Sequence, residues 1–229
     1  MTTLTTAPLA PLLDRTFAEA EAPASPQTRA ALAELTREER SRLATSTAEA
    51  DYRRFYGLAK DSYLAVSRET ARLLYMLVRS SGARSIVEFG TSFGISTLHL
   101  AAGLRDNGAG RVITTEFEPS KAARAQANFL EGGVADLVEL REGDALQTLA
   151  VDLPEQIDLV VLDGAKALYP AVLDLLEPRL RSGSLIVADN ADQNPDYLTR
   201  VRSSDGGYQS VPFADDVELS MYTGRATSR

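Results

Sequence analysis

The chain has 229 residues and a formal net charge of −8, with no cysteine, no tryptophan and a single histidine. This length suffices for one domain with a sizeable core, and the absence of cysteine excludes disulfides, a thiolate nucleophile and cysteine-ligated metal sites. The acidic balance argues against a general grip on nucleic acid, and the apolar runs are far shorter than the roughly 20 residues that span a membrane, so we expect a cytoplasmic protein without either partner.

The N-terminal part of the chain predicts an arm followed by helices. Residues 1–25 are rich in Thr, Ala and Pro and do not read as a secretory signal. We expect them to form a flexible arm with at most one short helix, near Leu12–Ala20. Residues 26–229 are expected to form a single domain, of which residues 26–81 supply extra N-terminal helices.

Start signals place these helices. The Ser25–Pro26 pair is typical of a helix N-cap and first turn. Thr36 with Glu39 fits a capping box, so we expect two helices before about residue 60. Apolar residues at helical spacing predict a further helix over Ser67–Ser81.

Beyond residue 81 short apolar runs alternate with helical stretches. Strands are expected at Ser85–Phe89, Arg111–Glu116, Val138–Leu140, Ile157–Leu162 and Ser184–Ala188. Helices are expected at Ile95–Leu104, Pro119–Leu130, Ala145–Val151, Leu168–Leu180 and Pro195–Arg202, and a closing antiparallel strand pair at Tyr208–Pro212 and Val217–Tyr222. Residues 82–229 therefore predict an α/β, Rossmann-like core: a mostly parallel seven-stranded sheet with an antiparallel C-terminal strand and helices on both faces.

The first predicted strand ends in a glycine loop. Gly90 and Gly94 let the backbone turn sharply and approach a ligand closely, and ligands of open α/β sheets bind outside the carboxyl ends of the strands. Glu116 ends the next strand, where a carboxylate can accept hydrogen bonds from both hydroxyls of a ribose. The glycine spacing matches neither a nicotinamide fingerprint nor a phosphate loop. A nucleoside without a pyrophosphate fits better, and a plain turn with a surface glutamate is the alternative.

Oxygen-bearing side chains follow the fourth and fifth strands. Asp163 comes directly after the fourth, and Asp189 and Asn190 come after the fifth. Because parallel strands end at the same edge of a sheet, we expect these side chains to lie close together, and such oxygen donors suit Mg²⁺, Mn²⁺ or Ca²⁺. The alternative is a helix N-cap at Asp163 and a turn at the Asp189–Asn190 pair.

Lys166 stands three residues after Asp163, in a chain with three lysines and 21 arginines. A lysine can lose its proton when its pKa falls, whereas an arginine effectively cannot. A nearby cation and partial burial both lower a lysine pKa, so Lys166 is a candidate general base, with a solvated surface lysine as the alternative. His99 lies inside a predicted helix, where we expect a packed or surface position and not catalysis.

With these motifs, the stretch from about Tyr63 to Arg225 resembles the cation-dependent class I S-adenosylmethionine-dependent O-methyltransferases of the catechol and caffeoyl-coenzyme A type, including small bacterial members. The resemblance implies S-adenosyl-L-methionine as cofactor, bound by Val66, Glu88, Gly90, Thr91, Ser92, Gly94, Ser96, Glu116, Asp144, Ala145 and Asp163. It implies a divalent cation, with Mg²⁺ as first candidate and Mn²⁺ or Ca²⁺ as others, held by Asp163, Asp189 and Asn190. It also implies Lys166 as the base, and a homodimer.

The implied reaction is methyl transfer to a hydroxyl of a small catechol-like or hydroxylated aromatic acceptor. Two adjacent acceptor oxygens could chelate the cation, which would lower the hydroxyl pKa while Lys166 takes the proton. The sequence departs from the family at Gly164–Ala165, after Asn190 and in the first 60 residues, all of which border the expected acceptor site. The aromatic side chains of Tyr52, Phe55, Tyr56 and Tyr63 could cover such an acceptor or simply pack between helices.

Two other functions stay open on the sequence alone. A metal-independent O- or N-methyltransferase would keep the cofactor, and its activity would persist in EDTA. A non-catalytic S-adenosylmethionine-binding protein would bind the cofactor and methylate no phenol, although the retained Lys166 and the three ligand positions argue against it. A dehydrogenase is disfavoured by the glycine spacing.

Overall fold

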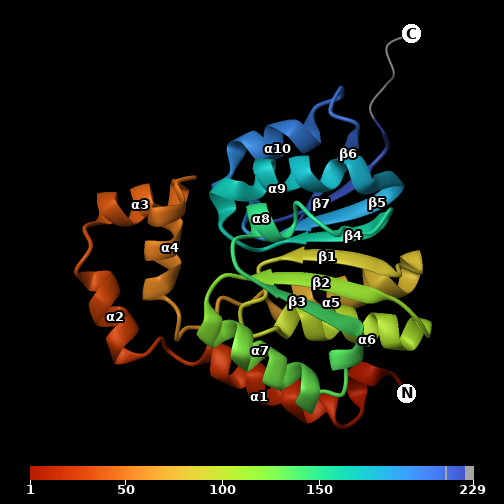
Figure 1. Ribbon diagram of the computed structural model, residues 1–229, viewed down its shortest axis with the longest axis horizontal. Coiled ribbons are helices and arrows are strands. Elements are labelled where there is room, and N and C mark those ends of the chain that lie inside the picture. Colours follow the sequence, from red (N-terminus) through yellow and green to blue (C-terminus); the bar gives the residue numbers. More distant parts are fainter. Residues whose placement is uncertain (215, 225–229) are drawn as a thin grey trace.

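One twisted sheet organises the protein in the computed structural model, which describes residues 1–214 and 216–224 (Figure 1). The seven described strands lie in the order β3-β2-β1-β4-β5-β7-β6. Their bounds are β1 Ser85–Phe89, β2 Arg111–Glu116, β3 Val138–Glu142, β4 Ile157–Leu162, β5 Leu180–Ala188, β6 Tyr208–Phe213 and β7 Val217–Tyr222. Neighbours from β3 to β5 pair in parallel, whereas β7 pairs antiparallel with both β5 and β6. The expected fold class is thereby confirmed.

Alternating side chains of the central strands bury both faces of this sheet. On β1, Val87 joins the core under helices α8 to α10, whereas Ile86 joins the core under α5 and α6. Leu162 and Val161 of β4 divide in the same way, which explains why these strands are apolar throughout. The helices span α5 Arg68–Ser81, α6 Ile95–Asn107, α7 Pro119–Glu131, α8 Ala145–Thr148, α9 Tyr169–Leu176 and α10 Pro195–Arg202.

The sheet order reverses between β1 and β4. The chain leaves β1 toward β2 and β3 on one side and returns to β4 on the other. Open α/β sheets bind ligands at the carboxyl ends of the strands beside such a reversal. The residues after Phe89, Glu116 and Leu162 therefore border one crevice.

Element boundaries differ from expectation mainly around α9. This helix ends at Leu176, four residues early, because Pro178 cannot continue the α-helical hydrogen bonds and a short 3₁₀ turn, Glu177–Arg179, follows. β5 correspondingly begins at Leu180, where a register irregularity against β4 near Ile157 lengthens it toward its N-terminus.

The first 25 residues contain the helix expected near Leu12–Ala20, but they dock on the core and do not form a free arm. A 3₁₀ turn, Thr3–Thr5, leads into α1, which spans Leu9–Glu21. Leu9 and Leu12 are almost fully buried against Phe129 of α7 and the residues of α6 around Leu98. The apolar residues of α1 recur at helical spacing, so the segment gains enough buried surface to dock on the core.

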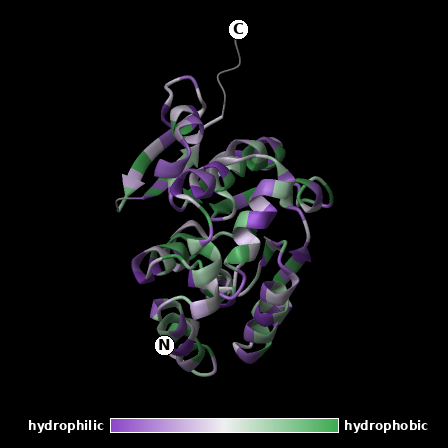
Figure 2. Cartoon of the chain, turned by 90° about the vertical axis from the view of Figure 1, so that its left-hand side faces the viewer, coloured by the Kyte–Doolittle hydropathy of each residue, from purple (hydrophilic) through white to green (hydrophobic). Residues whose placement is uncertain are grey.

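Three helices, not the expected two, follow before residue 60. They are α2 Pro26–Ala33, α3 Arg37–Thr45 and α4 Glu49–Leu58, and they stand beside the carboxyl edge of the sheet (Figure 1). The expected caps are present at Ser25 and Thr36. Helix α4 starts after Ala48 without a side-chain cap, so no capping residue in the sequence marks its start. Figure 2 faces these helices, whose ribbons alternate between hydrophobic and hydrophilic residues.

In the described part of the chain, no helix combines the length and the apolar character that crossing a bilayer requires. The end of the expected domain, residues 225–229, lies outside the described residues.

Candidate functional site

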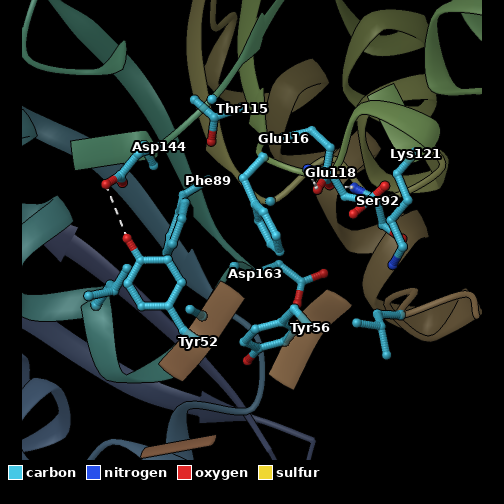
Figure 3. A pocket seen from close by; sticks show the side chains of 18 residues that line it. Tyr52, Tyr56, Phe89, Ser92, Thr115, Glu116, Glu118, Lys121, Asp144 and Asp163 are labelled. Atoms are coloured by element: carbon cyan, nitrogen blue, oxygen red, sulfur yellow. Dashed lines mark hydrogen bonds between the residues drawn. The ribbon is translucent and has the colours of Figure 1, made fainter. Parts of the chain in front are cut away.

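A cavity of about 650 Å³, counted with its open mouth, lies at the carboxyl ends of β1, β2 and β4 (Figure 3). Its lining includes six of the residues expected to bind a cofactor: Gly90, Ser92, Glu116, Asp144, Ala145 and Asp163. A smaller cavity of about 210 Å³ shares Ser92 and Asp163 with it and is also lined by the expected residues Thr91 and Ser96. The structure thus brings residues from four loops of the sheet edge around one crevice.

The glycine loop is shaped by close backbone packing. Gly90 has a positive φ of 101°, and a Cβ there would lie 2.7 Å from backbone atoms of Asp163 and Gly164. Gly94 has a φ of 89° and caps α6, where a Cβ would lie 2.5 Å from the Phe129 ring. Both positions therefore require glycine, because another side chain would clash with the end of β4 at Gly90 and with the Phe129 ring at Gly94.

Glu116 is held at the end of β2 by two backbone amides. Its Oε2 accepts a hydrogen bond of 2.8 Å from the N–H of Ser92, and its Oε1 accepts one of 3.0 Å from the N–H of Glu118. Burial raises the pKa of Glu116, although these amides and the nearby Lys121 ammonium counteract it. Each carboxylate oxygen keeps a further lone pair for a hydroxyl donor.

The opposite end of the cavity is built around Asp144. Its Oδ1 accepts the N–H of Leu146 at 2.9 Å and so caps α8, and its Oδ2 accepts the hydroxyl of Tyr52 at 3.1 Å (Figure 3). Tyr52 comes from α4, 92 residues away in sequence. Burial and the neighbouring Asp144 carboxylate raise the pKa of Tyr52 to about 12, so its hydroxyl stays a donor.

Thr115 adds a polar atom that the sequence did not single out. Its side chain is 2% exposed and lines the cavity between Asp144 and Glu116 (Figure 3). Its Oγ1 is buried and has no hydrogen-bond partner among the described residues. A buried hydroxyl without a partner is costly.

Lys166 and Asp163 form a close ion pair. The Nζ of Lys166 lies 2.6 Å from Oδ1 of Asp163, and both side chains are largely buried. Burial alone would lower the pKa of Lys166, but the Asp163 carboxylate and, more weakly, Asp189 hold it above its ordinary value. The expected lowering of this pKa therefore does not occur with the protein's own charges, because the nearest groups are anionic.

Asp189 and Asn190 extend this cluster from the end of β5. Burial, followed by the neighbouring Asp163 carboxylate, raises the pKa of Asp189 to about 7. The hydroxyl of Tyr169 donates to the backbone carbonyls of Leu162 and Asp189 and thereby fixes the ends of β4 and β5 side by side. Two carboxylates that face each other in a buried site favour a positive charge between them.

The amide of Asn190 is also oriented. Asn190 adopts a left-handed φ of 49°, and its Nδ2 donates to Oδ2 of Asp216 at 3.1 Å. The described residues contain no group of three or more histidine, cysteine or acidic side chains arranged to hold a metal ion. The candidate set of Asp163, Asp189 and Asn190 has two carboxylates and one amide, which are ligand types that hard divalent cations accept.

Several expected residues lie outside the linings of these two cavities. Val66 packs in a core cluster with Phe17 and Ile95, and Lys166, Asp189 and Asn190 lie beside the cavities. Glu88 lies fully buried beneath the glycine loop and accepts hydrogen bonds from Thr97 and from Thr114, the latter at 2.6 Å. Burial raises the pKa of Glu88 to about 7, against the hydroxyl groups that surround it.

His99 is packed, as expected from its place in α6. Its Nδ1 lies 2.8 Å from the carbonyl of Ile95, and its ring meets Phe17 edge-on. Burial lowers the pKa of His99 to about 4.

The known proteins that this chain resembles are methyltransferases. A sequence family described as "Methyltransferase domain" matches residues 87–191. A catechol O-methyltransferase of Mycobacterium tuberculosis is 35% identical over 142 residues, which are 62% of this chain and 64% of that protein. One of Niastella koreensis is 35% identical over 130 residues, 56% of this chain and 58% of that protein. The chain thus spans less than two thirds of the length of these curated relatives.

A longer match is found with a protein of Mycobacteroides abscessus whose name assigns it provisionally to the O-methyltransferases. It is 30% identical over 176 residues, which are 71% of this chain and 75% of that protein. Among solved structures, the O-methyltransferase TomG of Streptomyces achromogenes, in complex with S-adenosylmethionine, has a TM-score of 0.61 and 29% identity over 87% of this chain and all of its own. An O-methyltransferase of Bacillus cereus at 22% identity (TM-score 0.60, 92% of this chain and 97% of its own) shares the fold.

Proposed function

We propose that this chain, which belongs to the O-methyltransferases, uses S-adenosylmethionine as the catechol-type members do and methylates a hydroxyl of a small catechol-like or hydroxylated aromatic acceptor. The single observation that carries the proposal is one crevice in which Asp144 stands at one end, Glu116 lies further along, and Asp163, paired with Lys166, forms part of the lining. A cytoplasmic homodimer remains our expectation for the protein as a whole.

The residues present fit the cofactor. Glu116 offers two carboxylate oxygens to the ribose hydroxyls. Gly90 lets the backbone at the end of β1 pack directly against Asp163 and Gly164, which line the same cavity. When bound, S-adenosylmethionine supplies an electrophilic methyl group on a positively charged sulfur. The aromatic and apolar lining from α4, including Tyr56, would exclude water from the reacting atoms.

The residues also fit a hard divalent cation. Asp163, Asp189 and Asn190 would hold it. Burial and, after it, the Asp163 carboxylate raise the pKa of Asp189, and a cation bound there would offset both effects. When bound, it lowers the pKa of an acceptor hydroxyl. Lys166 lies beside this set, and a cation held there would neutralise the carboxylates that keep its pKa high. The Nζ of Lys166, once deprotonated, is the atom that we propose to take the hydroxyl proton.

A methyl-transfer screen tests the function. Catechols, hydroxybenzoates, hydroxylated amino acids and coenzyme A thioesters are incubated with radiolabelled S-adenosylmethionine, with Mg²⁺ or with EDTA. We expect transfer to compounds with two adjacent oxygens, lost in EDTA. Transfer that persists in EDTA would instead favour a metal-independent methyltransferase. Cofactor binding without transfer to any compound would favour a non-catalytic binding protein.

A further inference from the structure

A buried lysine in the same cavity has no role in the reaction proposed above. Lys121, on α7, is 4% exposed, and its Nζ lies 3.4 Å from the Oγ of Ser92 and 5.2 Å from the centre of the Phe93 ring (Figure 3). Among the described residues, no carboxylate forms an ion pair with it, whereas buried lysines are ordinarily paired.

The charge of Lys121 is only partly balanced by the protein. Burial lowers the pKa of Lys121, and the more distant carboxylates of Glu116, Glu118 and Asp163 counteract this. The best direct partner is a neutral hydroxyl at long range. An anionic group brought by a ligand would complete the coordination of this ammonium.

The position of Lys121 indicates which part of a ligand it meets. Asp144, Tyr52 and Thr115 mark one end of the cavity, and Lys121 and Ser92 lie at the other, beyond Glu116 (Figure 3). The second cavity continues from that end, since both cavities share Leu64, Ser92 and Asp163. If the adenine lies near Asp144 and the ribose binds Glu116, the amino-acid part of the cofactor lies at the Lys121 end.

The α-carboxylate is the only anionic group of S-adenosylmethionine. We propose that the ammonium of Lys121 binds this α-carboxylate, so that the site selects nucleosides that carry the intact amino-acid chain. The proposal rests on the proposed function, because it assumes that the cavity takes this cofactor. The rival role is structural: Lys121 contacts Ser92, whose backbone N–H holds Glu116, so its loss could disturb the ribose end instead.

A pair of ligands separates these two roles. S-adenosylhomocysteine carries the amino-acid chain, whereas 5′-methylthioadenosine shares its base, ribose and sulfur and lacks the carboxylate. Binding of both is measured by calorimetry to wild type, Lys121→Met, Lys121→Arg and the matched control Lys60→Met, which removes the same charge from an exposed position. Thermal melts verify that each variant is folded.

We expect Lys121→Met to weaken S-adenosylhomocysteine binding about 10- to 100-fold, the usual effect of a lost charge-assisted hydrogen bond. Binding of 5′-methylthioadenosine should change less than about twofold, Lys121→Arg should retain most of the affinity, and Lys60→Met should match wild type. If Lys121→Met does not fold, Lys121→Arg against wild type is compared with the same two ligands, and a preference for the carboxylate ligand must persist.

Other outcomes overturn the proposal. Equal losses for both ligands would show that Lys121 only supports the Ser92–Glu116 contact. Unchanged binding together with a raised KM for carboxylate-bearing acceptors would assign the lysine to the acceptor. Failure of wild type to bind either ligand would be a different result, since it contradicts the proposed function itself and removes the premise of this assignment.

Discussion

The Nζ of Lys166 lies 2.6 Å from the Oδ1 of Asp163, three residues earlier in the chain, and the two side chains are largely shielded from water. Asp189, from the next strand, adds a second carboxylate to this pair. The proposed base and two carboxylates are thus held together at the sheet edge that the cavity borders.

Replacing the proposed base Lys166 should greatly slow turnover without preventing the cofactor from binding. We expect Lys166→Met to lower kcat by about 10²- to 10⁴-fold, the usual contribution of a positioned base. Binding of S-adenosylhomocysteine, measured by calorimetry, should stay within about threefold of wild type. Turnover within a factor of two of wild type would contradict the role of Lys166.

Substitution of the proposed cation ligands should abolish the stabilisation of the folded protein by Mg²⁺, which can be measured without substrate. We expect Mg²⁺ to raise the melting temperature of the wild type, because a bound ion stabilises the folded state. The Asp189→Asn and Asn190→Ala variants should lose most of this rise, whereas Asp192→Asn serves as an exposed control from the same loop. A rise of equal size in all four proteins would place the cation elsewhere.

The proposed contact between Glu116 and the ribose can be tested by a substitution that removes the charge and keeps the shape of the side chain. We expect Glu116→Gln to weaken S-adenosylhomocysteine binding about 10-fold, because hydrogen bonds to an ionised acceptor contribute about 1.5–3 kcal/mol. Glu155→Gln, an exposed position far along the sequence, is the matched control. Calorimetry measures both, and equal affinities would show that Glu116 does not contact the ligand.

His99 predicts a dependence of stability on pH. Burial lowers its pKa to about 4, whereas the unfolded chain has a value near 6.5, so the unfolded state binds the extra proton between these values. The contribution of His99 to the free energy of unfolding should therefore fall by about 3 kcal/mol as the pH falls from 6.5 to 4. Urea unfolding at the two ends of this window should show that wild type loses about 3 kcal/mol more stability than His99→Gln.

Glu88 opposes this trend and must be separated from it. Its pKa is raised by burial to about 7, so the folded state holds a proton that the unfolded chain releases above pH 4.5. Its contribution is therefore lost as the pH rises toward 7. In the Glu88→Gln variant, the free energy of unfolding should fall more steeply as the pH drops from 6.5 to 4 than it does in wild type. An unchanged dependence on pH would show that Glu88 is ionised throughout.

The docking of α1 can be measured by a core truncation. Leu12 is 1% exposed, and we expect Leu12→Ala to lower the free energy of unfolding by about 2–5 kcal/mol, the range for buried leucines. Met76→Ala, at a largely exposed position, should change it by less than about 0.5 kcal/mol. A change equally small at Leu12 would restore the flexible arm that the sequence predicted.

The sequence by itself determined the sheet and the residues at its edge. The bounds of β1, β2 and β4 follow from short apolar runs between helices, and Gly90, Glu116 and Asp163 end those runs. These signals are local, because a strand buried on both faces must be apolar and a turn beside a ligand needs glycine or a polar side chain. Chain order then places all strand ends at one edge.

Only the tertiary structure decided which distant groups share the site. The Tyr52 hydroxyl meets Asp144 across 92 residues, and Thr115 is left without a partner in the cavity. Lys121 is a buried cation, although its sequence context reads as an ordinary helix turn. The docking of α1 likewise depends on surfaces of α6 and α7 that the first 25 residues do not encode. Burial and pairing depend on packing between elements, so no local pattern reports them.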